Sequence, residues 1–434
     1  MPLPASRRGK AGAHRPRPST WPAAIALAAG ALLAPWTFPP ATAQEQKPAP
    51  AAEGKPAAEV QRIAILLVRQ LRDRLPPLSL LDLPPDDDGL AGAKLAIADN
   101  NTTGRFLSQE FTLEVVESAK PEELVASVGK RVEDGVGFIV ADVEPDTLLA
   151  LADATVGKEA VVFNAGAADD RLRNADCRAN VKHTAPSRAM LTDALGQYLA
   201  WKQWRKVFLV LGPQPEDKLY ADAFRRTAKR YGLKIVEERE FAYEPGSRRS
   251  DGGYEQIQQQ IPTFTQNAQA HDVVVVADEG SLFGDYLPYR TWEARPVVGT
   301  SGLYATSWHP AVELWGGTQF QNRFKRMNKR DMRALDYNVW MAVRSVGEAA
   351  TRRKGGDVAD LVAYLRSAEF ELAAFKGQKL TYRAWNGQLR QPVFVATAKL
   401  HVTVSPQPGF LHQMTELDTL GFDKPESTCK AFTK

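Results

Sequence analysis

A regular alternation of short apolar runs with segments of helical length is the feature that most constrains the fold. The first four runs are strand-like and rich in apolar residues, at 62–68, 111–118, 136–142 and 160–165. Between the second and third runs, residues 121–135 begin with Pro and acidic residues and carry a helical apolar stripe. This order predicts the α/β class, with a parallel sheet that is covered by helices on both faces.

The same pattern restarts near residue 187 with an expected helix over residues 187–204. We therefore expect two Rossmann-like lobes, divided near residues 182–187. In the first lobe, residues 92–104 are interpreted as the end of a helix that enters a polar loop. The later strands are expected at 206–213, 233–243, 272–279 and 296–302, and the later helices at 217–232 and, interrupted by Pro262, at 254–267.

Beyond about residue 319 the chain becomes helical again, and it then ends in the strand-like residues 391–404. A late return of the chain to the first lobe explains this order, although periodicity alone does not establish it. The expected organisation is a first lobe of residues 61–183 plus about 319–378, a second lobe of 184–318 plus about 379–404, and a tail of 405–434.

The first 43 residues have the pattern of a secretory signal peptide. Five basic residues precede an apolar run at 21–33 that is too short to span a bilayer, and Ala-Thr-Ala at 41–43 fits a cleavage site. An N-terminal membrane anchor is the alternative. Residues 44–60, rich in Pro, Ala and Lys, are interpreted as a flexible leader. We therefore expect an exported protein of the periplasm.

Removal of the signal peptide changes the charge of the chain. The full sequence has 55 Lys and Arg against 51 Asp and Glu, and residues 1–43 contain five of the basic residues and no acidic one. The mature chain keeps 50 against 51, a net charge of −1. This balance gives no electrostatic case for binding nucleic acid.

The sequence has no familiar motif for catalysis or metal binding. It contains no P-loop, no G-x-S-x-G motif and no H-E-x-x-H motif. His309 and Glu313 lie four residues apart, but one His and one Glu do not make a metal site. The acidic run at residues 86–88 is interpreted as a solvated loop. We expect no enzyme activity, no cofactor and no metal.

The chain has two cysteines, Cys177 and Cys429. In an oxidising compartment they favour one disulfide over a metal site, and two free thiols are the alternative. Cys429 lies in a polar tail with little apolar content. A disulfide would therefore dock this tail near the expected division between the lobes.

In open parallel sheets, ligands bind beyond the carboxyl ends of the strands. The loop 164–168 is of particular interest, because its small residues would let backbone N–H groups approach a ligand, with a helix N-terminus expected near Asp169. A tight strand-to-helix connection is the alternative. The candidate ligand residues are Asp142, Glu144, Asn164, Ala165, Gly166, Ala167, Tyr220, Asp278, Glu279, Ser301 and Tyr304.

Three segments resemble the type I periplasmic binding proteins, in particular the Leu/Ile/Val receptors of ABC transporters: residues 99–118, 181–199 and 375–395. The last is similar to the family pattern F-x-G-x-x-G-x-x-F followed by Asp/Asn-Gly, with Leu380 in place of the second Gly. The resemblance covers roughly residues 62–404. It implies two lobes joined by a hinge of several strands, a small ligand in the cleft between them, and an ABC permease as partner.

Two further segments, residues 278–292 and 405–429, resemble a subfamily that is associated with PQQ-dependent alcohol dehydrogenase systems. This resemblance implies a substrate-binding protein that is linked to alcohol oxidation. The alternative is a periplasmic sensor or accessory protein of the dehydrogenase system with the same ligand-binding fold.

Amino-acid receptors of this family hold the ligand carboxylate with a Ser after one strand and with a Thr in the loop after the next. Pro145 aligns with that Ser, and Ala168 aligns with that Thr. Ser301 stands where the family has the acid that holds the amino group, and Glu279 where it has an aromatic residue. Because a buried charge without partners is costly, the resemblance implies a closing cleft but not an α-amino-acid ligand.

Overall fold

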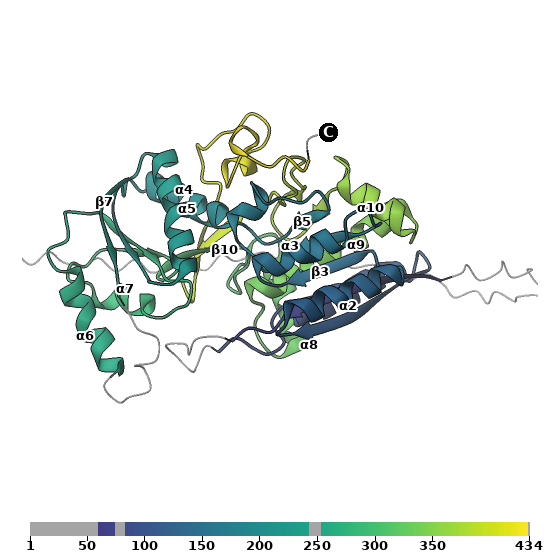
Figure 1. Ribbon diagram of the computed structural model, residues 1–434. Helices are drawn as coiled ribbons and strands as arrows, with labels where there is room; N and C mark the ends of the chain where they lie inside the picture. The colour runs from purple at the N-terminus through teal and green to yellow at the C-terminus, as the bar shows by residue number, and fades with distance from the viewer. Residues whose placement is uncertain (1–59, 74–82, 243–252, 433–434) are drawn as a thin grey trace, which may run out of the picture. The chain divides into compact units, whose positions relative to one another are not determined.

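The computed structural model describes residues 60–73, 83–242 and 253–432 (Figure 1). The expected signal peptide and nearly all of the expected leader lie outside these ranges. The described residues belong to one compact unit. None of the helices in them is long and apolar enough to cross a membrane.

Five parallel strands form the first sheet, in the order β2-β1-β3-β4-β5. Its central strands are apolar because both faces are covered: Ile65 and Leu67 of β1 point into one hydrophobic core, and Leu66 and Val68 point into another. The bounds are β1 Gln61–Gln70, β2 Gln109–Ser118, β3 Phe138–Asp142, β4 Val161–Asn164 and β5 Val181–His183.

Helices from two distant parts of the chain cover this sheet (Figure 1). On one face, α2 and α3 close the core; on the other face, α1 packs with α8, α9 and α10. The chain therefore returns to the first sheet after residue 317. The bounds are α1 Leu90–Gly104, α2 Pro121–Glu133, α3 Pro145–Ala154, α8 Gly317–Asn328, α9 Ala334–Arg353 and α10 Val358–Arg366.

Two glycines let α1 and α9 lie in direct backbone contact. A Cβ atom on Gly92 would lie 1.9 Å from the carbonyl oxygen of Asp336, and one on Gly347 would lie 2.0 Å from Oδ1 of Asn100. Both distances are far shorter than any real contact, so a larger residue at either position would force the two helices apart.

The expected polar loop near residue 100 is wrong, because α1 continues to Gly104. The Asn residues that indicated a loop have partners outside the helix. Asn100 Nδ2 donates to the carbonyl of Val343 at 3.0 Å, and Asn101 exchanges two hydrogen bonds with the backbone of Phe111. These tertiary contacts outweigh the weak helix propensity of Asn.

The second sheet has seven strands in the order β14-β13-β10-β9-β8-β6-β7. Strands β6 to β10 are parallel to one another. Strand β13 pairs antiparallel with β10, and β14 pairs antiparallel with β13. The bounds are β6 Lys206–Leu211, β7 Lys234–Glu240, β8 Val273–Ala277, β9 Val297–Gly299, β10 Leu303–Thr306, β13 Val393–Ala396 and β14 His401–Ser405.

Helices cover both faces of the second sheet as well. One core forms beneath α4 (Arg188–Trp201) and α5 (Pro215–Tyr231), and the other beneath α6 (Gly253–Thr265) and α7 (Leu287–Arg290). The prediction of an α/β fold with two parallel-stranded units is confirmed. The short hairpin β11 (Leu372–Ala373) and β12 (Lys379–Leu380) lies outside both sheets.

The C-terminal segment, residues 406–432, packs against both parts of the fold. It contains the short 3-10 helices η6 (Glu416–Thr419) and η7 (Lys424–Glu426). The backbone N–H of Gly421 donates to the buried carboxylate of Asp193 on α4 at 2.8 Å. Polar contacts of this kind hold the segment together with the buried side chains of Leu417 and Leu420.

Candidate ligand site at the strand ends

The carboxyl end of β4 leads into the loop of small residues, and the amide of Asn164 closes this loop. Its Oδ1 accepts from the N–H of Ala167 at 2.9 Å, and its Nδ2 donates to the carbonyl of Ala167 at 2.8 Å. Nδ2 also lies 3.0 Å from Nδ1 of His183. Burial holds the pKa of His183 well below its usual value, so the neutral ring can accept this bond. Asn164 therefore fixes a tight turn.

Gly166 and Ala167 explain the small residues of this loop. A Cβ atom on Gly166 would lie 2.5 Å from Oδ1 of Asp142 at the end of β3. Ala167 is 7 % exposed and packs in the core beneath α2 and α3. The neighbouring strand therefore lies against the bare backbone, as in the tight-connection alternative. Contact of the loop with a ligand stays a prediction.

A helix begins directly after Asp169, as expected, but it is a short one. Asp169 caps only the 3-10 helix η2, Asp170–Arg173, which ends after four residues because the backbone turns away from helical angles at Asn174. The loop presents its carbonyls inward instead. Those of Ala167 and Asp169 each accept a hydrogen bond of 2.9 Å from the buried guanidinium of Arg173.

Asp142 and Glu144 lie together at the carboxyl ends of β1 and β3. Asp142 is 8 % exposed and forms an ion pair of 3.2 Å with Arg72. Glu144 is exposed, and its N–H donates to Oε1 of Gln70 at 2.9 Å. Both candidates therefore lie where ligands bind in sheets of this kind.

The acidic run at residues 86–88 is the solvated loop that the sequence indicated only at Asp86, which is exposed. Asp87 pairs with Arg330 at 2.9 Å, and Asp88 pairs with Arg333 at 3.3 Å. Asp88 is 7 % exposed, and burial, with the nearby carboxylate of Asp336, raises its pKa to about 6. The described residues contain no group of side chains suited to hold a metal ion.

At the end of β8, Asp278 organises the backbone. It is 1 % exposed; Oδ1 accepts from the N–H of Leu282 at 2.9 Å, and Oδ2 accepts from Phe283 at 2.8 Å and Gly284 at 2.6 Å. Burial raises the pKa of Asp278. These bonds give Asp278 a structural role in the loop.

Glu279 forms a bidentate ion pair with Arg188, the first residue of α4. The two N–H···O distances are 2.8 and 2.7 Å, and this geometry is typical of strong charge-assisted bonds. Tyr220 of α5 is buried in the core, and burial raises the pKa of its hydroxyl. Glu279 is exposed whereas Tyr220 is not, and contact of either side chain with a ligand stays a prediction.

Ser301 and Tyr304 follow β9. Ser301 is 3 % exposed, and its Oγ has no hydrogen-bond partner within the described ranges. Tyr304 is half-buried on β10, with its ring 6.4 Å from that of His309. Nδ1 of His309 accepts from the N–H of Ala311 at 3.1 Å, which fits a structural role.

Asp217, which the sequence did not single out, connects α5 to the same strand end. It is fully buried and accepts hydrogen bonds from the N–H groups of Glu279 at 2.7 Å and Gln214 at 3.2 Å. Burial raises its pKa to about 7, with the charge of Asp278 acting in the same direction.

We expect Asp217 to make the protein less stable as pH rises from about 4 to about 7. The folded state holds its proton in this range and the unfolded state, with a pKa of about 3.9, does not. Asp217→Asn should reduce the slope of unfolding free energy against pH by up to about 1.4 kcal/mol per pH unit. Urea titrations from pH 4 to 8 measure this slope, with Asp146→Asn, an exposed carboxylate, as the control. Equal slopes in Asp217→Asn and wild type would contradict it.

Three segments connect the two sheets, and they bond to one another. His183 exchanges backbone hydrogen bonds of 2.9 Å with Gly387 and Leu389. The buried ammonium group of Lys376, on the connection between α10 and β13, donates to the carbonyl of Pro392 on the same connection at 2.8 Å and to the carbonyl of Ser307, just past β10, at 2.5 Å. Burial holds the pKa of Lys376 well below its usual value.

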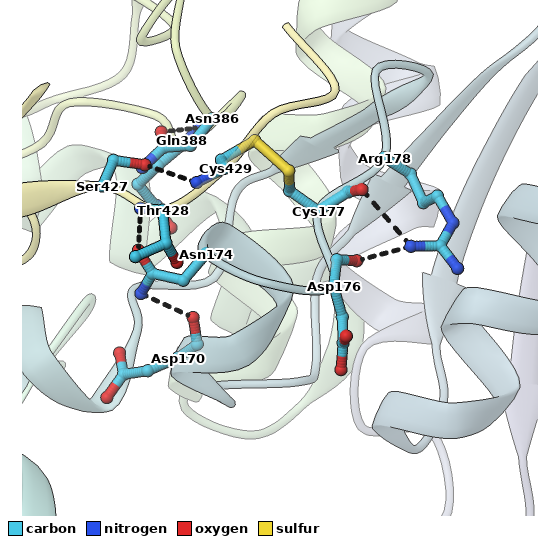
Figure 2. The surroundings of a disulfide bond; sticks show 10 residues. All are labelled: Asp170, Asn174, Asp176, Cys177, Arg178, Asn386, Gln388, Ser427, Thr428 and Cys429. Atoms are coloured by element: carbon cyan, nitrogen blue, oxygen red, sulfur yellow. Dashed lines mark hydrogen bonds between the residues drawn. A yellow bond between two sulfur atoms is a disulfide. The ribbon is translucent and has the colours of Figure 1, made fainter.

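A disulfide joins Cys177 and Cys429, as predicted, and ties the C-terminal segment beside η2 (Figure 2). The neighbouring N–H of Thr428 donates to Oδ1 of Asn174 at 3.4 Å. Figure 2 also shows Arg178 bonded to the carbonyls of Asp176 and Cys177. The tail is therefore docked close to β5, before the first connection between the sheets.

With this geometry, residues 85–280 match the family model described as "Periplasmic binding protein". The match begins before α1 of the first sheet and ends just past β8 of the second. No curated protein sequence matches the chain. The sheets and their connections define the type I periplasmic binding protein fold.

Solved structures with this fold cover most of the chain. A branched-chain amino acid ABC transporter periplasmic ligand-binding protein from Burkholderia xenovorans is 16% identical with a TM-score of 0.66, over 86% of this chain and 100% of that one. A leucine-, isoleucine-, valine-, threonine- and alanine-binding protein from Brucella ovis is 15% identical with a TM-score of 0.64, over 85% of this chain and 99% of that one. An R. palustris solute-binding protein in complex with benzoate is 14% identical with a TM-score of 0.60, over 86% of this chain and 99% of that one.

Sequence reasoning missed the basic partners of the candidate acids. Arg188 binds Glu279, Arg72 binds Asp142, and Arg333 binds Asp88. One signal in the sequence could have indicated Arg188 as a partner: it directly follows Ser187, at the start of an expected helix. Arg333 lies 245 residues beyond Asp88 in the sequence, so no local pattern could connect them.

Proposed function

We propose that this protein is the periplasmic substrate-binding component of an ABC transporter, which closes two lobes on a small ligand and presents it to an inner-membrane permease. The observation that carries the proposal is the family match over residues 85–280. The polar side chains past the strand ends support it, because ligands of open parallel sheets bind there. Binding would shift an open–closed equilibrium through differential affinity and needs no chemistry.

The lobes in this proposal keep the boundaries drawn from the sequence. The first comprises residues 61–183 and about 319–378, and the second comprises 184–318 and about 379–404. The return of α8 to α10 to the first sheet and of β13 and β14 to the second supports this division. The three bonded connections would form the hinge.

Two buried oxygens favour a ligand that donates hydrogen bonds. Oδ1 of Asp88 and Oδ1 of Asn338 accept no hydrogen bond from any described residue. Asn338 Nδ2 donates to the carbonyl of Ala165 at 3.2 Å, so its amide lies beside the loop after β4. Because an unsatisfied buried acceptor costs about 1–3 kcal/mol, hydroxyl, amide or ammonium groups of a ligand would be stabilised there.

We expect leucine, isoleucine and valine to bind weakly or not at all. Two positions would supply hydroxyl groups to the carboxylate of an amino-acid ligand, and neither residue has one. The first is Pro145, at the start of α3, and the second is Ala168. Ser301 supplies no charge for an ammonium group. Calorimetric titration of the purified protein checks this expectation. Micromolar or tighter binding of any of the three would show that the alignment at these positions is wrong.

Native mass spectrometry of the protein purified from its own periplasm tests the proposed function directly. We expect a fraction of the protein to carry one small molecule that is lost on unfolding, and a second titration with that molecule should give saturable binding. Steady conversion of the molecule into a product would instead indicate an enzyme. Protein that never retains or binds any small molecule would contradict a solute-binding role.

A second candidate function is a sensor or accessory protein of a PQQ-dependent alcohol dehydrogenase system. Its support is the resemblance of residues 278–292 and 405–429 to that subfamily. A permease and an ATPase encoded beside this gene would favour the transporter role. A neighbouring dehydrogenase or membrane histidine kinase without a permease would favour the sensor.

A further inference from the structure

A groove of about 750 Å³ lies between α1, α8 and α9, and none of its lining residues belongs to the candidate ligand site. Its apolar surface comes from Leu95, Met327, Trp340 and Phe375. Three arginines, Arg323, Arg326 and Arg344, also line it; we call it the basic groove. An adjoining cavity of about 690 Å³ shares Arg323 and Arg326 and adds Lys325 and Lys329. The volume is in the range of small-molecule sites.

The acidic residue that lines the basic groove is already engaged. Asp99 forms an ion pair with Arg323 through Oδ1, and its Oδ2 accepts from Nε1 of Trp340 at 3.0 Å. Asp99 therefore pairs directly with one of the three guanidinium groups, and its charge also acts favourably on Arg344.

The remaining two guanidinium groups lack full compensation. Arg344, with a side chain 17 % exposed, donates to Oδ1 of Asn100 and lies 3.9 Å from Glu348, which is also paired with Arg352 at 2.8 Å. Burial lowers the pKa of Arg344, and the charge of Arg323 acts in the same direction, although the charges of Asp99 and Glu348 oppose the shift. Arg326 is exposed, and its guanidinium has no bonded partner in the described part of the chain. An anion placed between them would relieve this imbalance.

Aromatic rings give the basic groove a firm apolar wall. The ring of Phe375 stacks on Phe320 with centroids 4.4 Å apart and lies 5.8 Å from the ring of Trp340. Phe375 has a φ of 54°, in the left-handed region that bulky residues rarely adopt. The stacking contacts hold the backbone in this conformation, which fixes the ring at the edge of the groove.

We propose that the basic groove is a second binding site, separate from the candidate ligand site, for an organic anion with an apolar body. Arg326 and Arg344 would bind the carboxylate, sulfonate or phosphate group. The rings of Trp340 and Phe375 and the side chain of Met327 would cover the apolar part. Charge alone would not suffice, because both arginines are accessible to water on one side and an inorganic ion would gain little there.

The probe that tests this is 1-anilinonaphthalene-8-sulfonate, compared with its uncharged counterpart N-phenyl-1-naphthylamine, in fluorescence titrations of the mature protein. We expect the double variant Arg326→Gln/Arg344→Gln to bind the sulfonate at least tenfold more weakly and the neutral dye within twofold of wild type. Sulfonate binding to wild type should also weaken as salt is raised.

The matched control removes two exposed arginines elsewhere, Arg62→Gln/Arg295→Gln, and should leave both dyes unaffected. Arg326→Gln alone serves if the double variant fails to fold, because its exposed side chain holds no structural bond; it should weaken the sulfonate at least threefold. Equal sulfonate affinities in wild type and the Arg326 variants, or an equal loss in the control, would overturn the proposal. Neither result depends on the identity of the transported ligand.

Discussion

Asp418→Ala is expected to lower the free energy of unfolding by about 3–5 kcal/mol, because it leaves a buried arginine without its counter-ion. Asp418 and Arg383 are each 1 % exposed, and Nε of Arg383 lies 2.8 Å from Oδ1 of Asp418. Nε of Arg390 also binds this carboxylate, at 2.9 Å. The other nitrogens of Arg383 donate to carbonyls of Leu417, Leu420 and Phe422. Without Asp418 these neutral partners remain, but the guanidinium group loses its strongest opposing charge and keeps only the weaker influence of Asp423.

Urea denaturation measures the effect, with Asp222→Ala as the matched control. Asp222 is mostly exposed and pairs with Arg225 at the surface, and surface pairs contribute little. The double variant Arg383→Met/Asp418→Leu should recover much of the loss, since it removes both buried charges together. A loss in Asp418→Ala no larger than that in Asp222→Ala would contradict the prediction.

The strands could be predicted from the sequence because each is marked by a local run of apolar residues. Val273–Ala277 is an unbroken run of apolar residues and is fully buried as β8, and the same argument applies to β1, β3 and β4. The helix ends were less predictable. The Asn residues near position 100 continue α1 through partners on α9 and β2, and the segment after Asp169 stops after one helical turn.

The candidate site could be predicted as a set of positions but not as a set of interactions. Strand ends indicated Asp142, Asp278 and Glu279, and the structure places Asp142 at the last residue of β3 and the other two just past β8. Their roles depend on partners from remote segments: backbone N–H groups engage Asp278, whereas guanidinium groups engage the other two. Because such pairings form only after the chain folds, no local sequence pattern encodes them.

Removal of the disulfide, in Cys177→Ser/Cys429→Ser, is expected to lower the free energy of unfolding by about 3–5 kcal/mol. The bond joins residues 252 apart in the sequence, and the chain-entropy model gives roughly 5 kcal/mol for a loop of this size. This figure is an upper one, because the unfolded chain keeps some structure. The native tail should stay docked, since Glu426, three residues before Cys429, still pairs with Arg226 at 2.9 Å.

The two losses should be distinguishable although they are similar in size. The disulfide acts mainly on the unfolded chain, so its removal should expose more surface on unfolding and raise the dependence of unfolding free energy on urea concentration. Asp418→Ala acts on the native state and should leave that dependence unchanged. Intact mass supplies the control: both thiols of protein from its own compartment should be alkylated only after reduction. Alkylation without reduction, or equal stability of oxidised and Ser-substituted protein, would contradict the stabilising role of this bond.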